Sequence, residues 1–148
     1  MKSRRKGKSN NSVASPKVLL DYVLQKCNNN IFFDPCPLNP NWIVDGLKLN
    51  WGKHKYIYVN PPFSNVKLWI LKAKQEFQTN NNIQKILFLM KAECLGNKYS
   101  HGLENMCNIY CITNKLKFVG YTKTCGFSTV LLEFTRDKNK FWKTITLS

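Results

Sequence analysis

The sequence predicts an α/β fold with a sheet that is mostly parallel and ends in antiparallel C-terminal strands. Two observations support this prediction. In the earlier part of the chain, short apolar runs alternate with segments whose apolar residues recur at helical spacing. In the later part, apolar runs follow one another with only turns between them, which is typical of antiparallel pairing.

A length of 148 residues and an apolar content of 43% suit a single domain with one core, which we place at residues 13–148. Residues 1–12 hold lysine and arginine among glycine, serine and asparagine, and they predict a disordered basic tail. A phosphate clamp, a localisation signal and a frayed terminus are the alternatives for its role.

The first helix is predicted from Ser15 to about Cys27. Ser15 can cap it, Pro16 suits its first turn, and apolar residues follow at helical spacing. Asparagines end this helix. The apolar residues 31–33 then predict a short buried strand, which ends at the turn formed by Asp34, Pro35, Cys36 and Pro37.

Residues 56–59 predict a second buried strand, which ends at Asn60 because the two prolines that follow cannot continue a central ladder. Ser64 or Asn65 can cap a second helix, with apolar positions at Val66, Trp69, Ile70, Ala73 and Phe77. The loop at 38–54 contains Trp42, Asp45, Gly46 and Trp51. Asp45, Gly46 and Trp51 suit either a cofactor or base pocket or a glycine turn beside a buried tryptophan.

The remaining elements are predicted by short apolar runs. Residues 85–90 predict a third buried strand, 102–106 a short helix and 109–112 a fourth strand, and the closing strands are expected within 116–118, 127–134 and 141–147. Ligands bind open α/β sheets at the carboxyl ends of their strands. Asp34 and Asn60 each follow a predicted strand, so we expect both at the binding edge.

The charge predicts a polyanionic partner. Lysine and arginine number 23 against 8 acidic residues, which gives a formal net charge of +15. Nucleic acid fits this charge better than a membrane, because no apolar run approaches the roughly 20 residues of a spanning helix. The alternative is a surface of solvated lysines without a specific partner.

Six cysteines without short-spaced pairs, and no secretory signal ahead of them, predict reduced thiols in an intracellular protein that is not secreted. Cys107 and Cys111 with His101 match no strong zinc pattern, so we predict no metal site and buried structural cysteines instead. His54 and His101 are interpreted as surface or loop residues.

The motif formed by Asn60, Pro61, Pro62 and Phe63 predicts methyl transfer to an amino group. Such a group on an aromatic base is a poor nucleophile, because its lone pair is delocalised into the ring. The Asn60 side-chain oxygen and the Pro61 carbonyl can each accept one amino hydrogen, which points the lone pair at a methyl donor. The prolines fix the backbone, and Phe63 offers a stacking surface. The alternative is a plain strand-ending turn.

The second predicted constellation is Asp34, Pro35 and Cys36, which can meet the amino-acid part of the methyl donor. Asp34 would receive its ammonium group, and Ser15 and Pro16 would complete the cofactor pocket. The alternative for Asp34 is a helix cap or a turn aspartate. The Asn-Pro-Pro-Phe motif also suits enzymes that methylate RNA bases or glutamine side chains.

The order of these motifs resembles the phage-type DNA N6-adenine methyltransferase (Dam-like) family. The matching elements span about residues 15–134 and include Ser15-Pro16, Phe33-Asp34-Pro35, Asp45-Gly46-Leu47 with Trp51, Tyr58-Val59-Asn60-Pro61-Pro62-Phe63-Ser64 and Gly126-Phe127-Ser128-Thr129. This resemblance implies a Rossmann-like S-adenosylmethionine-dependent methyltransferase sheet, with Asn60 to Phe63 as the catalytic motif and the Asp34 region at the cofactor.

The resemblance further implies transfer of a methyl group from S-adenosylmethionine to the 6-amino group of adenine in DNA. The family is often encoded by phages and other viruses, so we expect the protein in the host cytoplasm or nucleus, or associated with a virion. The alternative is a catalytically inactive methyltransferase-fold protein that binds nucleic acid as a viral or assembly component. The lack of a glycine-rich loop after Asp34 favours this alternative.

Overall fold

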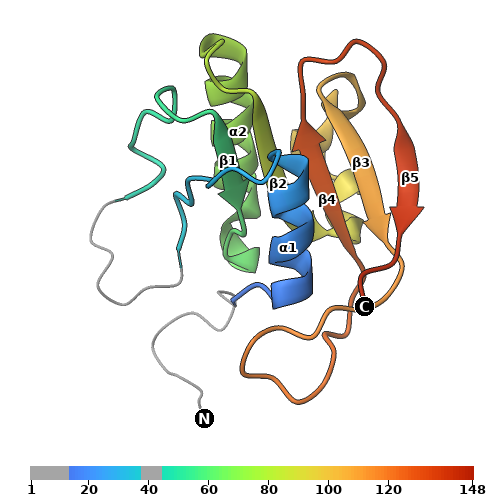
Figure 1. The fold of residues 1–148 in the computed structure, drawn as a ribbon. Helices are drawn as coiled ribbons and strands as arrows, with labels where there is room; N and C mark the ends of the chain where they lie inside the picture. Colours follow the sequence, from blue (N-terminus) through green and yellow to red (C-terminus); the bar gives the residue numbers. More distant parts are fainter. Residues whose placement is uncertain (1–13, 38–44) are drawn as a thin grey trace.

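The computed structural model describes residues 14–37 and 45–148. In this part of the chain, a five-stranded sheet carries helix α1, Lys17–Lys26, on one face and helix α2, Val66–Thr79, on the other (Figure 1). The predicted basic tail and Trp42 lie outside the described residues. The layers are therefore helix, sheet and helix, as an α/β fold requires.

The sheet has the strand order β1-β2-β4-β3-β5. Its strands are β1 Tyr56–Val59, β2 Lys85–Lys91, β3 Cys107–Ile112, β4 Thr129–Phe134 and β5 Trp142–Ile145. The β1/β2 and β3/β5 pairs are parallel, whereas β4 is antiparallel to both of its neighbours, β2 and β3.

The predicted mixture of a mostly parallel sheet with reversed C-terminal strands is therefore right for β4 and wrong for β5. The chain reverses between β4 and β5, but β5 does not pair with β4, because β3 already occupies that edge of β4. β5 pairs with the far edge of β3 instead and runs parallel to it. A single reversed strand thus lies inside the described sheet.

Both faces of the sheet are buried, which explains its nearly continuous apolar runs. In β1, Ile57 and Val59 pack in the core on the α2 side, whereas Tyr58 packs on the α1 side. In β2, Phe88 likewise packs on the α2 side and Leu87 on the α1 side. The period of two along each strand therefore decides which helix each side chain meets.

Both main helices form where the apolar spacing predicts them. All five predicted apolar positions of α2 are buried, and a 3₁₀ turn at Phe63–Asn65 precedes it. Neither Ser64 nor Asn65 acts as the predicted side-chain cap. Three further 3₁₀ turns follow β2, at Ala92–Gly96, Lys98–Ser100 and Leu103–Asn105, and the last of them lies where the short helix was predicted.

Two predicted strands are absent from the described structure. Residues 31–33 contribute one parallel bridge, between Phe33 and Ile57, and 116–118 pair with no strand. Leu116 and Phe118 are nevertheless buried in the core on the α1 side. The apolar pattern therefore predicted their burial correctly, but a buried segment need not pair with a strand. No helix of the described residues is long and apolar enough to cross a membrane.

Candidate active site

The carboxyl end of β1 brings two of the predicted site segments together. The backbone N–H of Phe33 donates to the carbonyl of Tyr56 at 2.8 Å, and the Phe33 carbonyl accepts the N–H of Tyr58 at 2.9 Å. Because the Phe33 segment runs parallel to β1, Asp34 leaves the sheet at the same edge as Asn60. The predicted meeting of Asp34 and Asn60 at one sheet edge is therefore present.

Ser15 connects the start of α1 to this edge. Its hydroxyl shares a hydrogen bond of 2.5 Å with the Tyr58 hydroxyl, and it accepts a hydrogen bond of 3.1 Å from the Asn60 side-chain nitrogen. The predicted helix cap is wrong, because α1 begins at Lys17 after Pro16 without a side-chain cap. Tyr58 is buried, and burial raises the pKa of its hydroxyl well above the usual value, so it stays protonated.

The bond from Ser15 determines how the Asn60 amide is turned. The amide is planar, and its nitrogen donates while its oxygen accepts. With the nitrogen directed at Ser15, the oxygen lies on the other branch of the amide and is turned away from the Ser15 hydroxyl. Sequence reasoning missed this contact, because 45 positions separate Ser15 from Asn60.

Asp34 lies in a turn, and its chemistry suits a cation. Its Oδ1 accepts the backbone N–H of Cys36 at 2.8 Å. Burial raises the pKa of Asp34 to about 6, against the weaker lowering effect of that hydrogen bond. Within the described residues Asp34 takes part in no ion pair. An approaching ammonium group stabilises the charged form of a half-buried carboxylate, so the residue fits its predicted partner.

The Asp45 to Trp51 segment is a packed turn. Trp51 is fully buried and donates from Nε1 to the carbonyl of Gly46 at 3.0 Å. A Cβ atom on Gly46 would lie 1.9 Å from the carbonyl oxygen of Pro35, so only glycine fits there. Asp45 is exposed and accepts the N–H of Leu47. Of the two interpretations, the glycine turn with a buried tryptophan is correct, and the segment packs against the Pro35 backbone.

Phe63 lines a cavity of about 320 Å³. The other lining residues are Phe118, Tyr121, Lys123, Thr124, Cys125 and Phe127. The ring of Phe127 meets Phe63 edge-on, with centroids 5.1 Å apart. The Lys91 ammonium lies 5.2 Å from the centroid of Phe63 and 4.6 Å from that of Phe127. The cavity therefore has aromatic walls, and the Lys91 ammonium group lies close to two of these rings.

The residues opposite Phe63 were not predicted as part of a site. Phe118 and Phe127 were interpreted only as members of closing strands. They belong instead to the connection between β3 and β4, which returns past the carboxyl end of β2, where Lys91 lies. The alternation of aromatic residues with lysine and glycine in that connection was the available signal.

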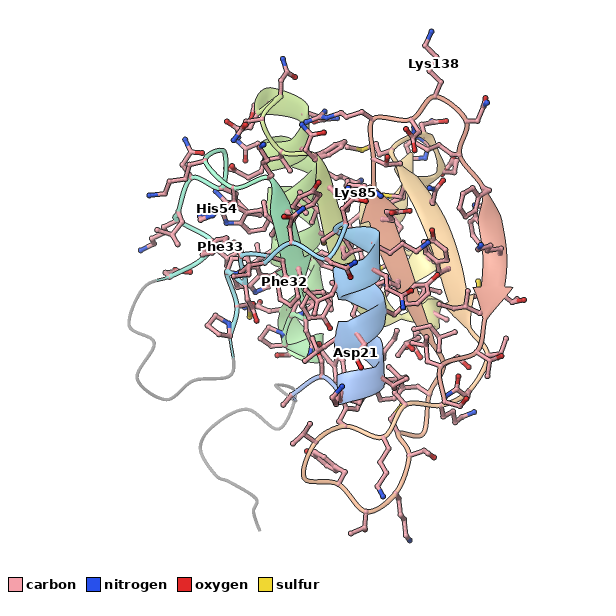
Figure 2. The ribbon with its side chains drawn as sticks, viewed as in Figure 1. Asp21, Phe32, Phe33, His54, Lys85 and Lys138 are labelled. Carbon is pink, nitrogen blue, oxygen red and sulfur yellow. The ribbon has the colours of Figure 1, made fainter. Side chains whose placement is uncertain are left out.

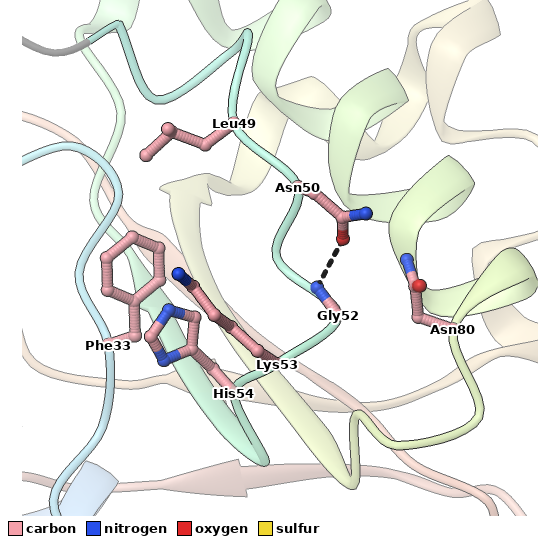
Figure 3. Close-up of a pocket in the computed structure, with 7 residues that line it drawn as sticks. All are labelled: Phe33, Leu49, Asn50, Gly52, Lys53, His54 and Asn80. Carbon is pink, nitrogen blue, oxygen red and sulfur yellow. Dashed lines mark hydrogen bonds between the residues drawn. The ribbon is translucent and has the colours of Figure 1, made fainter.

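A second cavity, of about 750 Å³, lies beside Phe33 and is shown in Figure 3. Its lining residues are Phe33, Leu49, Asn50, Gly52, Lys53, His54 and Asn80. His54 is a loop residue, as predicted, but its ring stacks on Phe33 with centroids 3.9 Å apart and an interplanar angle of 6°. The cavity lies where β1 begins, and none of residues 60–63 lines it.

The cysteines give no sign of metal or disulfide chemistry in the part of the chain that the structure describes. All six lie in it, and none of them is in a disulfide. No group of three or more histidine, cysteine or acidic residues in that part is placed to hold a metal ion. Cys27, Cys94 and Cys107 are buried, as predicted for structural cysteines, while the other three are half-buried.

The α/β sheet presents Asn60, Pro61, Pro62 and Phe63 at the end of β1, where the sequence predicted a motif for methyl transfer to an amino group. Comparison with family models is more specific. Residues 18–130 match the family DNA N-6-adenine-methyltransferase (Dam), and the chain belongs to this family. This confirms the resemblance stated from the motifs.

One curated relative is the DNA N-6-adenine-methyltransferase of Escherichia phage T1. It is 39% identical to this chain over 41 residues, which are 28% of the chain and 17% of the phage protein. The matched stretch thus spans much less than half of either protein.

Proposed function

We propose that this protein transfers a methyl group from S-adenosylmethionine to the 6-amino group of adenine in DNA. The observation that supports this most directly is the oriented amide of Asn60 at the end of β1. Asp34 lies at the same sheet edge, and Phe63 of the same motif lines a cavity. Membership of the adenine methyltransferase family supports the same reaction.

Asn60 and Pro61 would hold the two hydrogens of the target amino group. With its nitrogen donating to the Ser15 hydroxyl, the Asn60 amide would use its oxygen to accept one hydrogen of the target amino group. The Pro62 carbonyl accepts the N–H of Asn65 in the 3₁₀ turn, and the Pro61 carbonyl is the second proposed acceptor. Two acceptors on one amino nitrogen favour a tetrahedral geometry, which localises its lone pair.

Phe63 would hold the target base. An adenine inside a duplex cannot reach Asn60, so it would have to leave the base stack, as nucleobase-modifying enzymes require. The cavity beside Phe63 is aromatic on both sides, with Phe118 and Phe127 facing Phe63. Stacking of a base on one such ring contributes about 1–3 kcal/mol.

The turn at Asp34 would hold the cofactor. Bound S-adenosylmethionine would supply an electrophilic methyl group. The Asp34 carboxylate would bind its ammonium group, Pro35 and Cys36 would shape the turn, and Pro16 would close the pocket from the start of α1. Ser15, also predicted at the cofactor, is bonded to Asn60, so we assign it chiefly to positioning that amide.

The net charge of +15 supports a nucleic-acid substrate rather than a protein side chain. DNA is proposed over RNA because the family acts on DNA. For residues 1–12 we keep the proposal of a phosphate-binding tail. Activity on nucleic acid also suits the predicted residence inside a host cell.

The test measures transfer of labelled methyl from S-adenosylmethionine to matched duplex DNA and RNA, with products digested to nucleosides. We expect N6-methyl-2′-deoxyadenosine from DNA with the wild type, and a 10²- to 10³-fold lower rate with Asn60→Ala, roughly the cost of removing one transition-state acceptor. Asn60→Asp keeps an acceptor oxygen and should retain more activity than Asn60→Ala.

Binding of S-adenosylhomocysteine should survive in Asn60→Ala, since the cofactor contacts lie on the Asp34 turn. Equal transfer rates for the wild type and Asn60→Ala would remove Asn60 from the mechanism. If no variant transfers label while all of them still retard DNA in a gel, the protein is a non-catalytic nucleic-acid binder instead.

A further inference from the structure

Three aromatic rings and two lysines alternate on the α1 face of the sheet, away from Asn60. We call Tyr22, Lys26, Tyr110, Lys143 and Phe141 the aromatic-lysine row. Tyr22 meets Tyr110 edge-on with centroids 5.8 Å apart, and Phe141 meets Tyr110 edge-on at 5.6 Å. The row therefore crosses from α1 over β3 to the start of β5.

The two ammonium groups lie between the rings. Lys26 Nζ is 5.1 Å from the ring centroid of Tyr22 and 4.8 Å from that of Tyr110. Lys143 Nζ is 5.6 Å from the centroid of Tyr110 and 5.4 Å from that of Phe141. Each lysine is thus held by two ring contacts, which fix its charge without neutralising it.

The nearest carboxylate cannot neutralise both lysines. Glu133, beneath the row, accepts bonds on Oε1 from Asn108 and Tyr110, and on Oε2 from Lys85 at 2.9 Å. Lys85 lies beside the C-terminal end of α1 (Figure 2). Within the described residues, neither Lys26 nor Lys143 takes part in an ion pair. One carboxylate and three ammonium groups leave an excess of positive charge.

The mutual effect of these charges is visible in Lys26. Burial lowers the pKa of Lys26, and the charges of Lys143 and Lys85 lower it further, against the raising effect of Glu133. A group in this position gains when an anion arrives, because the anion reduces the repulsion between the neighbouring ammonium groups.

We propose that the aromatic-lysine row is a second nucleic-acid contact that binds a single strand, with a backbone phosphate on Lys26 and Lys143 and a base on Phe141. Phe141 is 40% exposed, which leaves room for a base to stack on it. A cationic track beside exposed aromatic rings is the combination with which proteins hold single strands.

The row lies far from the proposed catalytic residues. Ser15, which bonds Asn60, precedes α1, whereas Lys26 is its last residue. A helix of ten residues is about 15 Å long, so the two ends of α1 mark two separate places on the molecule. This contact goes beyond methyl transfer and depends on no step of that reaction.

The test measures binding of a fluorescent oligothymidylate at several salt concentrations. This strand contains no adenine, so failure of the adenine-specific reaction leaves the result unaffected. For Lys26→Gln with Lys143→Gln we expect about tenfold weaker binding at physiological salt. The slope of log affinity against log salt should fall by roughly 0.7 for each lost phosphate contact. Phe141→Ala should weaken binding without changing the slope.

The matched control removes two exposed positive charges outside the row, with Lys48→Gln in the Asp45 to Trp51 segment and Lys98→Gln in the 3₁₀ turns after β2. This control should bind nearly as tightly as the wild type, and all variants should keep the wild-type circular dichroism melt. An equal loss of affinity in the control would overturn the site, since net charge alone would then explain binding. Complete displacement of the strand by inorganic phosphate at constant ionic strength would overturn it too.

Discussion

Asp34 is half-buried in the turn beside the carboxyl end of β1, whereas Glu133 is buried in β4, and their surroundings shift their pKa values in opposite directions. Asp34 accepts the backbone N–H of Cys36, and burial raises its pKa to about 6. Burial also raises the pKa of Glu133, but hydrogen bonds from Asn108, Lys85 and Tyr110, with the charge of Lys85, lower it overall. Glu133, with several hydrogen-bond donors, stabilises the fold, whereas Asp34, with one donor, is suited to bind an incoming cation.

This contrast matches the two ends of the sheet. At the carboxyl end of β1, the polar groups are few, and their bonds orient an amide and leave a carboxylate without an ion pair among the described residues. At the opposite end, Glu133 connects β2, β3 and β4. Satisfied polar groups stabilise the sheet, whereas a functional site keeps groups that a ligand completes.

The largest expected effect is on stability, from Glu133→Gln. The variant keeps the shape of the side chain but leaves the Lys85 charge partly buried without its carboxylate, so we expect a loss of about 3 kcal/mol in the free energy of unfolding. Urea unfolding measures it. The matched control is Glu104→Gln, an exposed residue whose loss should change stability by less than about 0.5 kcal/mol. Equal losses of unfolding free energy in the two variants would show that Glu133 does not stabilise the sheet.

The pH dependence of Glu133 has a definite sign. Its pKa in the folded protein is lowered, so its contribution is fully present above the unfolded pKa of about 4.5 and is lost as the pH falls through the folded value. Glu133→Gln should therefore remove part of the acid-induced loss of stability below about pH 4.5.

The next effect is on cofactor affinity and stability, from Asp34→Asn. Removing a carboxylate whose pKa is raised from 3.8 to about 6 should stabilise the fold at pH 7 by roughly 2 kcal/mol. The gain should disappear as the pH falls from 6 to 4, because the wild-type carboxylate is then protonated. S-adenosylhomocysteine should bind about tenfold more weakly, as expected when one charged hydrogen bond is lost.

Asp45→Asn is the control for that experiment. Asp45 accepts the N–H two residues on, as Asp34 does, but it is exposed. It should change neither stability nor cofactor affinity. Unchanged affinity in Asp34→Asn, measured by calorimetric titration, would remove Asp34 from the cofactor site.

The smallest expected effect is on turnover, from Ser15→Ala. Without the hydroxyl that accepts a hydrogen bond from its nitrogen, the Asn60 amide can rotate. We therefore expect kcat to fall about tenfold with KM unchanged, because the lost hydrogen bond contributes about 1 kcal/mol to the orientation of the amide. Ser15→Thr keeps the hydroxyl and should restore most of the rate. Ser64→Ala, exposed beside the motif, serves as control. A raised KM with normal kcat would instead indicate a direct cofactor contact of Ser15.

The sequence predicted those features that depend on local patterns. The ends of β1 and α2, and the sheet edge shared by Asp34 and Asn60, follow from apolar periodicity and from prolines that stop a strand. The bond between Ser15 and Asn60 was not predictable, because the two residues are adjacent only after folding. Glu133 was missed because a charged residue in a strand is usually exposed.

The reversed strand β4 also determines when the fold can form during synthesis. β2 and β3 leave the ribosome before β4, yet neither can pair with the other, because each binds one edge of β4. Until Phe134 has emerged, the nascent chain exposes two apolar strands with unpaired edges, and strand edges of this kind recruit other chains. Placing the reversed strand at the centre of the sheet therefore delays the pairing of both of these edges until β4 has been synthesised.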